Sequence, residues 1–266
     1  SVVDAFDAMT NDRVYKKAIP EQEALDEIVL KIERFVDEGI NIIILSDRKV
    51  SKKMAPIPIL LACSFVHQTM INRKKRSKFG IIIESAEPRE PHHFAILFGY
   101  GASAINPYMV NEIIHEQVNQ GFITNVKADY AIKNYNKAIA KGILKIMNKI
   151  GISTLHSYRG SQIFEIVGFN SQFVEKYFPY TASRIEGIGL YEIEREINER
   201  YKYAYPDTCI DKRLGLNIGG DYRWRRNGEK HMFNPTTISK LQQAVRLSDQ
   251  ASYDVYAKAI NEQSEN

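Results

Sequence analysis

The segment NIIIL at residues 41–45 is an uninterrupted apolar run, and FGIII at residues 79–83 repeats it. Runs of this kind are typical of strands that are buried on both faces of a parallel sheet. A helical pattern at residues 59–71 lies between them, and a second one at 91–98 leads to a short third strand at 104–108. Strands that alternate with helices favour right-handed crossovers. The sequence therefore predicts an α/β fold with a parallel sheet.

Helical patterns flank this core on both sides. Before it, apolar residues recur at three- and four-residue steps between Ala24 and Phe35, and Gly39 is placed to end that helix. After it helices predominate, and residues 213–221 are Gly-rich and looped. We predict these later helices at residues 131–150, 162–167, 171–178, 191–203 and 236–262.

The composition is that of an ordinary globular chain. Its 266 residues are 44% hydrophobic and 26% charged, and the formal net charge of +4 is too small to indicate nucleic-acid binding. No apolar run approaches the ~18–20 residues that span a bilayer, and the first residues lack the basic and apolar regions of a secretory signal. We therefore expect a soluble cytoplasmic protein, with neither nucleic acid nor membrane as a partner.

The chain has two cysteines, Cys63 and Cys209. Two thiols make neither a disulfide framework nor a zinc knuckle. An iron–sulfur cluster is held by several thiolates, more than this chain can supply. We therefore expect the chain to hold no such cluster by itself.

Polar residues follow each of the first two predicted strands. Ser46-Asp47-Arg48 comes directly after the first, and Glu84-Ser85-Ala86-Glu87 comes directly after the second. Ligands bind at the carboxyl ends of the strands in open α/β sheets. These segments are therefore either a ligand-lining surface or plain turn and cap residues, and the sequence leaves both open.

His92 and His93, close to Glu87 and Glu90, suggest a metal cluster. Adjacent histidines on a helix point about 100° apart, so they rarely share one ion. Neither an HExxH nor a DxH pattern accompanies them. The sequence therefore favours a role at the start of a helix or in packing over a metal site.

Two further segments are rich in basic residues. Residues 73–78 hold five cations without interleaved aromatic residues, which favours a solvated turn at a helix end over nucleic-acid binding. Residues 219–226 (GGDYRWRR) place two glycines beside three arginines, but outside a strand–loop–helix phosphate motif. We therefore expect a structural loop there rather than a ligand site.

Five stretches in fixed order carry a further signal, from about residue 36 to the end. They are NIIILSDRKVSKKMAPIPILLACSFVHQ (41–68), IIIESAEPREPHHFAILFGYGASAINPY (81–108), KGILKIMNKIGISTLHSYRGSQIFEIVG (141–168), SRIEGIGL (183–190) and GGDYRWRRNGEKHMFNPTTISKLQQAV (219–245). Together they resemble the large chain of glutamate synthase.

The resemblance implies an activity for the parent enzyme. In that family an amidotransferase domain releases ammonia from glutamine, and the ammonia reaches a flavin site where 2-oxoglutarate is aminated and the imine is reduced. The parent reaction thus converts glutamine, 2-oxoglutarate and a reductant into two glutamates, with FMN and an iron–sulfur cluster in the full-length enzyme. The implied partners are the remaining domains of the same enzyme and a reductase subunit or ferredoxin.

The same resemblance places no catalytic, cofactor-binding or metal-binding residue in this chain. The family's nucleophile is an N-terminal cysteine, where this chain has Ser1, and its spaced cysteine triplet has no counterpart here. We therefore expect an internal piece, a scaffold between the amidotransferase and flavin sites, that is inactive and binds no flavin alone. The alternative is an autonomous non-catalytic scaffold or binding module.

A second resemblance concerns the N-terminus. VVDAFDAMTNDRVYKKAIPEQEALDEI at residues 2–28 resembles the C-terminal helix region of HD-GYP cyclic-di-GMP phosphodiesterases, with Asp4 at the position of a metal-binding aspartate. One carboxylate without its partners cannot hold a di-metal centre. This resemblance suggests a junction between pieces of two genes, and a remnant of such a phosphodiesterase is a second alternative.

These resemblances predict three parts. Residues 1–36 form a helical segment that is the HD-GYP-like tail. Residues 37–205 form an α/β region like the glutamate synthase central domain, followed within it by helices. Residues 206–266 begin an FMN-barrel-like domain, as the opening segment of an incomplete (β/α)8 barrel.

Overall fold

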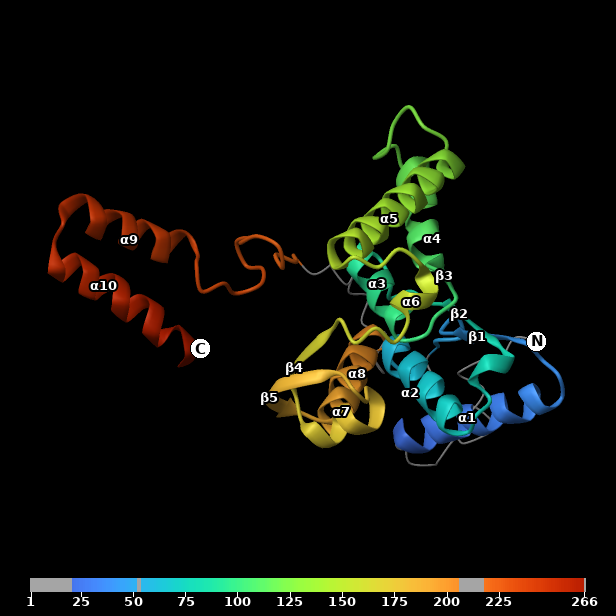
Figure 1. Ribbon diagram of the computed structural model, residues 1–266. Coiled ribbons are helices and arrows are strands. Elements are labelled where there is room, and N and C mark those ends of the chain that lie inside the picture. The colour runs from blue at the N-terminus through green and yellow to red at the C-terminus, as the bar shows by residue number, and fades with distance from the viewer. Residues whose placement is uncertain (1–20, 52–53, 206–217, 266) are drawn as a thin grey trace. The chain divides into compact units, whose positions relative to one another are not determined.

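The computed structural model describes residues 21–51, 54–205 and 218–265 (Figure 1). The chain divides into two compact units, Ser1–Asp207 and Thr208–Asn266, and each is described by itself. The first unit contains both sheets, whereas the described residues of the second unit are helical or looped. Asp4 and Cys209 lie outside the described residues.

The first unit is built around a parallel three-stranded sheet. Its strands β1 (Ile42–Ser46), β2 (Gly80–Glu84) and β3 (Ala104–Asn106) lie side by side in sequence order. Helix α2 (Ile59–Asn72) connects the first two strands, and α3 (Pro91–Gly99) connects the second to the third. The predicted alternation of strands and helices is confirmed, including the adjacent parallel pairing of the two isoleucine runs.

Burial along these strands alternates instead of being uniform. Ile43 and Ile81, which are paired across β1 and β2, are fully buried, as are Leu45 and Ile83. Ile42, on the opposite face of β1, is 49% exposed. The prediction of strands buried on both faces is therefore wrong. Side chains alternate between faces along a strand, and only one face of this sheet lies wholly in the apolar core.

Helix α1 (Glu21–Asp37) supplies much of that core. Its inward residues follow the predicted three- and four-residue steps, and Gly39 follows it with a φ of +90°, a conformation that favours glycine. The predicted helix is thereby confirmed over the described residues, which begin at Glu21. The buried residues of α1 are Ala24, Leu25, Ile28, Val29, Ile32 and Val36.

Helices α4 (Tyr108–Asn119) and α5 (Ala128–Ile150) pack against each other to form an arm (Figure 1). The predicted helix at 131–150 is confirmed as α5, which ends at Gly151 with a φ of +75°. Sequence analysis missed α4. Its N-cap is Pro107, which lies inside the strand predicted at 104–108, and no helix was predicted after that strand.

A second, two-stranded parallel sheet follows the short helix α6 (Leu155–Tyr158). It pairs β4 (Glu165–Phe169) with β5 (Ala182–Ile188), and α7 (Ser171–Tyr177) connects them. The predicted helix at 162–167 is therefore wrong, whereas those at 171–178 and 191–203 are confirmed as α7 and α8 (Leu190–Ala204). Gly168, inside β4, has a φ of +82°, which a helix does not allow.

The second unit contains a helical hairpin, α9 (Pro235–Leu247) packed on α10 (Gln250–Asn261), with a short 3-10 turn at Glu262–Glu265. The single helix predicted at 236–262 is wrong. Ser248 takes a left-handed conformation with a φ of +49°, and Asp249 then caps α10 by accepting a 2.8 Å hydrogen bond from the backbone N–H of Ser252. No barrel strand is described in this unit, so the barrel assignment stays a prediction.

Candidate functional site

The two predicted polar segments do meet at the carboxyl edge of the three-stranded sheet. Ser46 is paired with Glu84 at the last position of the β1–β2 register, and Asp47 follows one residue later. Asp47 is 4% exposed, and its carboxylate accepts hydrogen bonds from the Ser85 hydroxyl at 2.6 Å and the Ala86 N–H at 3.0 Å. Asp47 therefore closes the turn that leaves β2.

Glu84 accepts hydrogen bonds from the ends of both neighbouring strands. Its carboxylate accepts hydrogen bonds from the Ser46 hydroxyl at 2.6 Å, from Arg48 Nε at 2.9 Å and from Asn106 Nδ2 at 3.4 Å. Hydrogen bonds with an ionised partner are stronger than neutral ones. The Glu84 carboxylate therefore ties together the ends of all three strands.

Arg48 and Tyr108 complete this edge. The guanidinium carbon of Arg48 lies 4.3 Å from the centroid of the Tyr108 ring, which is a cation–π contact, and a terminal nitrogen lies 3.6 Å from Glu112. Burial, followed by the hydrogen bond and the charge of Asp47, raises the pKa of Tyr108. The phenol thus stays protonated beside the carboxylate. At this edge the polar groups form hydrogen bonds with one another. Of the two roles that sequence analysis left open, a ligand-lining surface or turn and cap residues, this arrangement fits the second.

Glu87 differs from its neighbours because it reaches the N-terminus of α2. Both carboxylate oxygens lie 3.3 Å from the backbone nitrogen of Ile59, one of the unpaired donors at that helix end. Desolvation by the surrounding protein is the largest effect on Glu87 and raises its pKa to about 7, although part of the residue is open to solvent. Glu87 also lines a small cavity of about 190 Å³, with Leu60, His93 and Ile96.

The two histidines serve the start of α3, as the sequence predicts. His93 Nδ1 accepts hydrogen bonds from the N–H groups of Arg89 and Glu90, at 3.2 and 3.3 Å, and so caps the helix. The His92 ring packs edge-on against Phe164, with centroids 6.3 Å apart. Among the described residues, no three His, Cys, Asp or Glu side chains gather closely enough to hold a metal ion.

The basic turn after α2 also makes ion pairs that the sequence did not predict. Arg73 pairs with Glu33, and Lys75 pairs with Glu33 at 2.8 Å and with Asp37 at 2.7 Å. The hydrogen bond from Lys75 is the largest effect that lowers the pKa of Glu33. The predicted turn at the end of a helix is confirmed, since it follows α2 and most of its residues are exposed, and Arg73 and Lys75 in addition fasten it to α1.

The Gly-rich segment at 219–226 folds as a loop, as predicted. The N–H of Glu229 donates a 2.9 Å hydrogen bond to the carbonyl of Gly219, and His231 Nε2 lies 2.6 Å from the carbonyl oxygen of Gly220. Trp224, Arg225 and His231 border a depression of about 620 Å³ within this unit.

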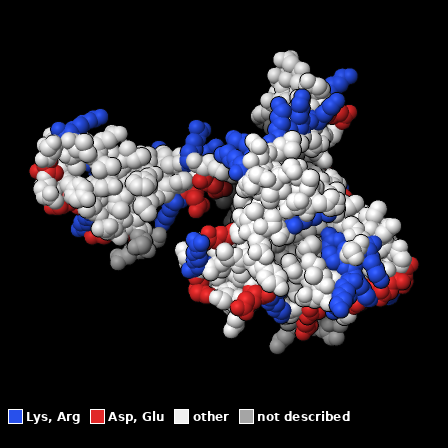
Figure 2. Space-filling model, in the orientation of Figure 1, with Lys and Arg blue, Asp and Glu red and all other residues white. Residues whose placement is uncertain are grey.

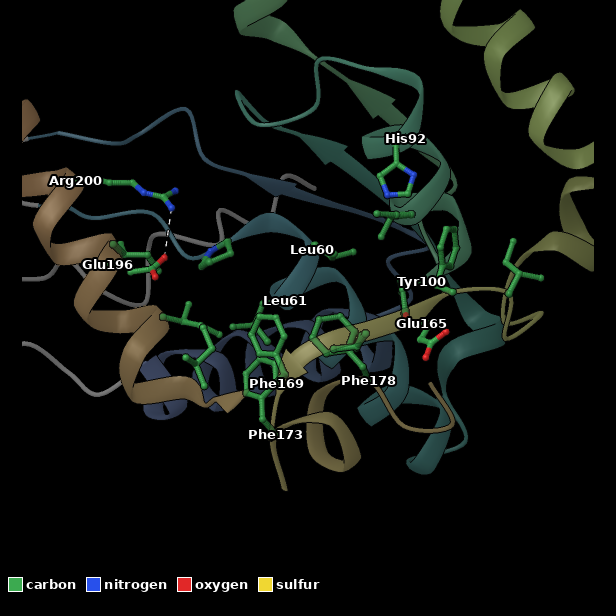
Figure 3. Close-up of a pocket in the computed structure, with 18 residues that line it drawn as sticks. Leu60, Leu61, His92, Tyr100, Glu165, Phe169, Phe173, Phe178, Glu196 and Arg200 are labelled. Atoms are coloured by element: carbon green, nitrogen blue, oxygen red, sulfur yellow. Dashed lines mark hydrogen bonds and ion pairs between the residues drawn. The ribbon is translucent and has the colours of Figure 1, made fainter. Parts of the chain in front are cut away.

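An apolar cavity of about 530 Å³ lies within the first unit, next to the smaller one that Glu87 lines (Figure 3). Its walls come from α2, α3, the second sheet, α7 and α8. Figure 3 shows the rings of Phe169, Phe173 and Phe178 gathered in it, while Glu196 and Arg200, joined by a 3.5 Å ion pair, lie at one end. The cavity can receive apolar groups beside a charged rim.

Sequence analysis did not single out this cavity. The recurrence of phenylalanine at 169, 173 and 178 was the available signal, since its spacing is close to that of one helix face. It was obscured because Phe169 belongs to β4 and only Phe173 lies within α7. Arg200 carried no local signal, because only the packing of α8 brings it to the cavity.

Comparison with known proteins identifies the family behind this geometry. A family model described as the glutamate synthase central domain matches residues 3–170, which is more than half of the chain. The chain belongs to the glutamate synthase central domain family. The matched region includes the parallel sheet and its carboxyl edge. It also includes the walls of the apolar cavity as far as β4, and it ends one residue after that strand.

The similarity to glutamate synthases extends beyond residue 170 of this chain. The NADPH-dependent large chain of Bacillus subtilis is 42% identical over 242 residues, which are 91% of this chain and 16% of that protein. The NADH-dependent enzyme of Schizosaccharomyces pombe is 37% identical, over 91% of this chain and 12% of its own. The ferredoxin-dependent enzyme of Pyropia yezoensis is 34% identical, over 90% and 16% respectively. The chain thus spans less than a fifth of the length of these relatives.

The glutamate synthase match also bears on the N-terminal segment. The family model begins at residue 3 and therefore includes most of residues 2–28, which we compared with HD-GYP phosphodiesterases. That second resemblance receives no support from the comparisons, and neither does the gene junction that it suggested. No described helix is both long and apolar enough to cross a membrane.

Proposed function

We propose that this chain is the central scaffold of a glutamate synthase large chain, between the domain that releases ammonia from glutamine and the flavin site. The parent enzyme would convert glutamine and 2-oxoglutarate, with a reductant, into two glutamates in the cytoplasm. The observation that carries the proposal is the family match over residues 3–170, together with 42% identity to the Bacillus subtilis large chain.

The structure supports a scaffolding role for the candidate residues. Asp47 and Glu84, at the edge where α/β proteins bind ligands, are occupied by bonds to the neighbouring turns and strands. The His93 side chain is engaged in capping the N-terminus of α3. We therefore assign no catalytic, cofactor-binding or metal-binding residue to this chain, and we place FMN and the iron–sulfur cluster in the remaining domains.

The partners that follow are those remaining domains and an electron donor. The relatives are named for NADPH, NADH and ferredoxin, so the donor is either a nicotinamide-linked reductase subunit or ferredoxin. The segment 206–266 would continue into the FMN-binding barrel, and the 242-residue alignment with the Bacillus subtilis chain, which extends past residue 170, supports that continuity.

A chimeric enzyme tests this proposal. The matched region of the Bacillus subtilis large chain is replaced by this chain, and NADPH-dependent glutamate formation is measured with the isolated chain alongside. We expect the chimera to form glutamate and the isolated chain to form none and to carry no flavin absorbance. The chimera with Ile43→Asp should be inactive, and its control with Ile42→Asp should keep activity, because only Ile43 is buried.

The outcomes separate the two remaining functions. A folded, flavin-loaded chimera that forms no glutamate would overturn the scaffold proposal in favour of an autonomous binding module. Glutamate formation or flavin retention by the isolated chain would also overturn the scaffold proposal, because the chain would then have an activity or a flavin site of its own.

A further inference from the structure

A row of lysines runs along α5, away from the sheet edge and the apolar cavity. Lys133, Lys137, Lys141, Lys145 and Lys149 recur at every fourth residue, and all five are exposed. Each lies about 6 Å further along the helix axis than the one before, and neighbours in the row share a helix face. Figure 2 shows basic side chains gathered over the arm that contains α5. These five residues are called the lysine row.

The acids of the described chain do not neutralise the lysine row. The only acidic residue of α5 is Asp129, in its first turn. On α4, which packs against α5, Glu112 pairs with Arg48 at 3.6 Å, and Glu116 accepts a hydrogen bond from Gln120. No ion pair among the described residues includes a member of the row.

Other helices of this chain arrange their charges differently. On α1, Lys31 pairs with Glu27 four residues away at 3.3 Å, and on α8 Arg195 pairs with Glu199 at 3.8 Å. Like charges at this spacing repel, so the lysine row opposes the stability of the helix that carries it. Carboxylates placed over the row by another molecule would remove that repulsion.

Two exposed apolar side chains adjoin the lysine row, Leu144 near its middle and Tyr130, which is 57% exposed and lies three residues before Lys133. Leu144 is 63% exposed and lies three residues after Lys141, so the two side chains are neighbours on the helix surface. Protein interfaces combine an apolar centre with a charged rim. Nucleic-acid surfaces favour arginine forks and aromatic platforms, whereas α5 has no arginine and a single strongly exposed aromatic residue, Tyr130, at its start. The combination therefore favours a protein partner over a nucleic acid.

We propose that the lysine row and Leu144 form the docking surface for a partner protein that presents carboxylates around an apolar side chain. A second copy of this chain fits poorly, because the acids of α1 and α8 are largely engaged within their own units. The proposal goes beyond the scaffold role, and its test does not depend on glutamate formation.

The test uses the full chain and a designed acidic probe. The probe is a labelled helical peptide of about 20 residues with glutamate at every fourth position and one exposed leucine. Its binding is measured by fluorescence anisotropy at low and high salt, beside a labelled DNA duplex of about 20 base pairs. The variants are K137E/K141E/K145E, Leu144→Ser, and the control K176E/K202E/K240E, which changes the net charge equally at scattered positions.

We expect saturable peptide binding that weakens with salt. Binding should fall about tenfold or more in the α5 triple variant and about threefold in Leu144→Ser, with little change in the control. Circular dichroism establishes that each variant keeps its helices. The proposal is overturned if the peptide does not bind, if the scattered control loses as much affinity, if Leu144→Ser has no effect, or if DNA binds more tightly through the same lysines.

Discussion

Arg76 Nε donates a 2.8 Å hydrogen bond to Nδ1 of His67, inside the turn that joins α2 to β2. The guanidinium also donates to the carbonyl oxygens of Phe79 at 2.6 Å and Gly101 at 2.8 Å. One half-buried side chain therefore links α2 to the residue before β2 and to the turn after α3. This arrangement requires a neutral His67, because a protonated Nδ1 cannot accept.

The stability of the fold should depend on the protonation of His67. Burial, with smaller effects of the Arg76 and Arg159 charges, lowers the pKa of His67 from 6.5 to about 4. A lowered folded-state pKa gives a stabilisation that is present above pH 6.5 and is lost as the pH falls toward 4. We expect the Tm to fall through this window, and to fall less in His67→Gln, whose amide oxygen can still accept from Arg76. The exposed His156→Gln is the control, and equal slopes in all three proteins would refute the prediction.

Gly101 should be intolerant of a side chain. It has a φ of +110°, and an added Cβ would overlap the His67 ring. Gly121 has a φ of +75° and open space around its Cα. We expect Gly121→Ala to lower the free energy of unfolding by about 1 kcal/mol, from backbone strain alone, and Gly101→Ala by about 2–4 kcal/mol. Urea unfolding of the two variants compares them directly, and similar losses would contradict the proposed overlap.

Neighbouring residues of β1 should differ sharply in their response to charge. Ile43→Asp buries a carboxylate without a partner and should cost several kcal/mol, enough to unfold a domain of ordinary stability. Ile42→Asp places the same group at a position that is 49% exposed and should cost about 1 kcal/mol or less. Thermal unfolding measures both, and an unchanged transition in Ile43→Asp would show that the burial of this strand is wrong.

Hydrogen exchange should be slow in the sheet and fast in the helical hairpin. Ala244 and Thr237 are the buried residues of α9, whereas Val245 and Leu247 are more than half exposed. A hairpin with so little buried apolar surface gains little against chain entropy. We expect amide protection at residues 41–108 and rapid exchange in α9 and α10 of the isolated chain. Uniformly slow exchange in a monomer would contradict this and would favour a self-sufficient module.

Much of the first sheet could be predicted because its signals are local. The isoleucine runs, Pro91 at the first turn of α3 and Gly151 after α5 each act within a few residues of themselves. The prediction of a helix at 162–167 was wrong because it, too, used only local signals. Over so short a run, its apolar residues fit both the helical and the strand period. The segment forms a strand because it pairs with β5, some 17 residues later.

The candidate site was predictable in position but not in role. Ser46–Arg48 and Glu84–Glu87 meet where parallel strands end, which follows from topology. The role of each carboxylate depends on donors that arrive from other segments, such as Ser85 for Asp47 and Asn106 for Glu84. These distances exist only in the folded chain.

The sequence by itself determined which segments are strands and helices in the core, and the family, because these depend on residue order and short-range periodicity. Tertiary structure alone decided that Ile42 faces outward while Ile43 is buried, and that Lys75 is paired while Lys141 makes no ion pair with any described residue. The physical reason is the same in each case. Burial and charge pairing are set by atoms that are distant in the chain and close in space, and a residue's own neighbours in sequence do not specify them.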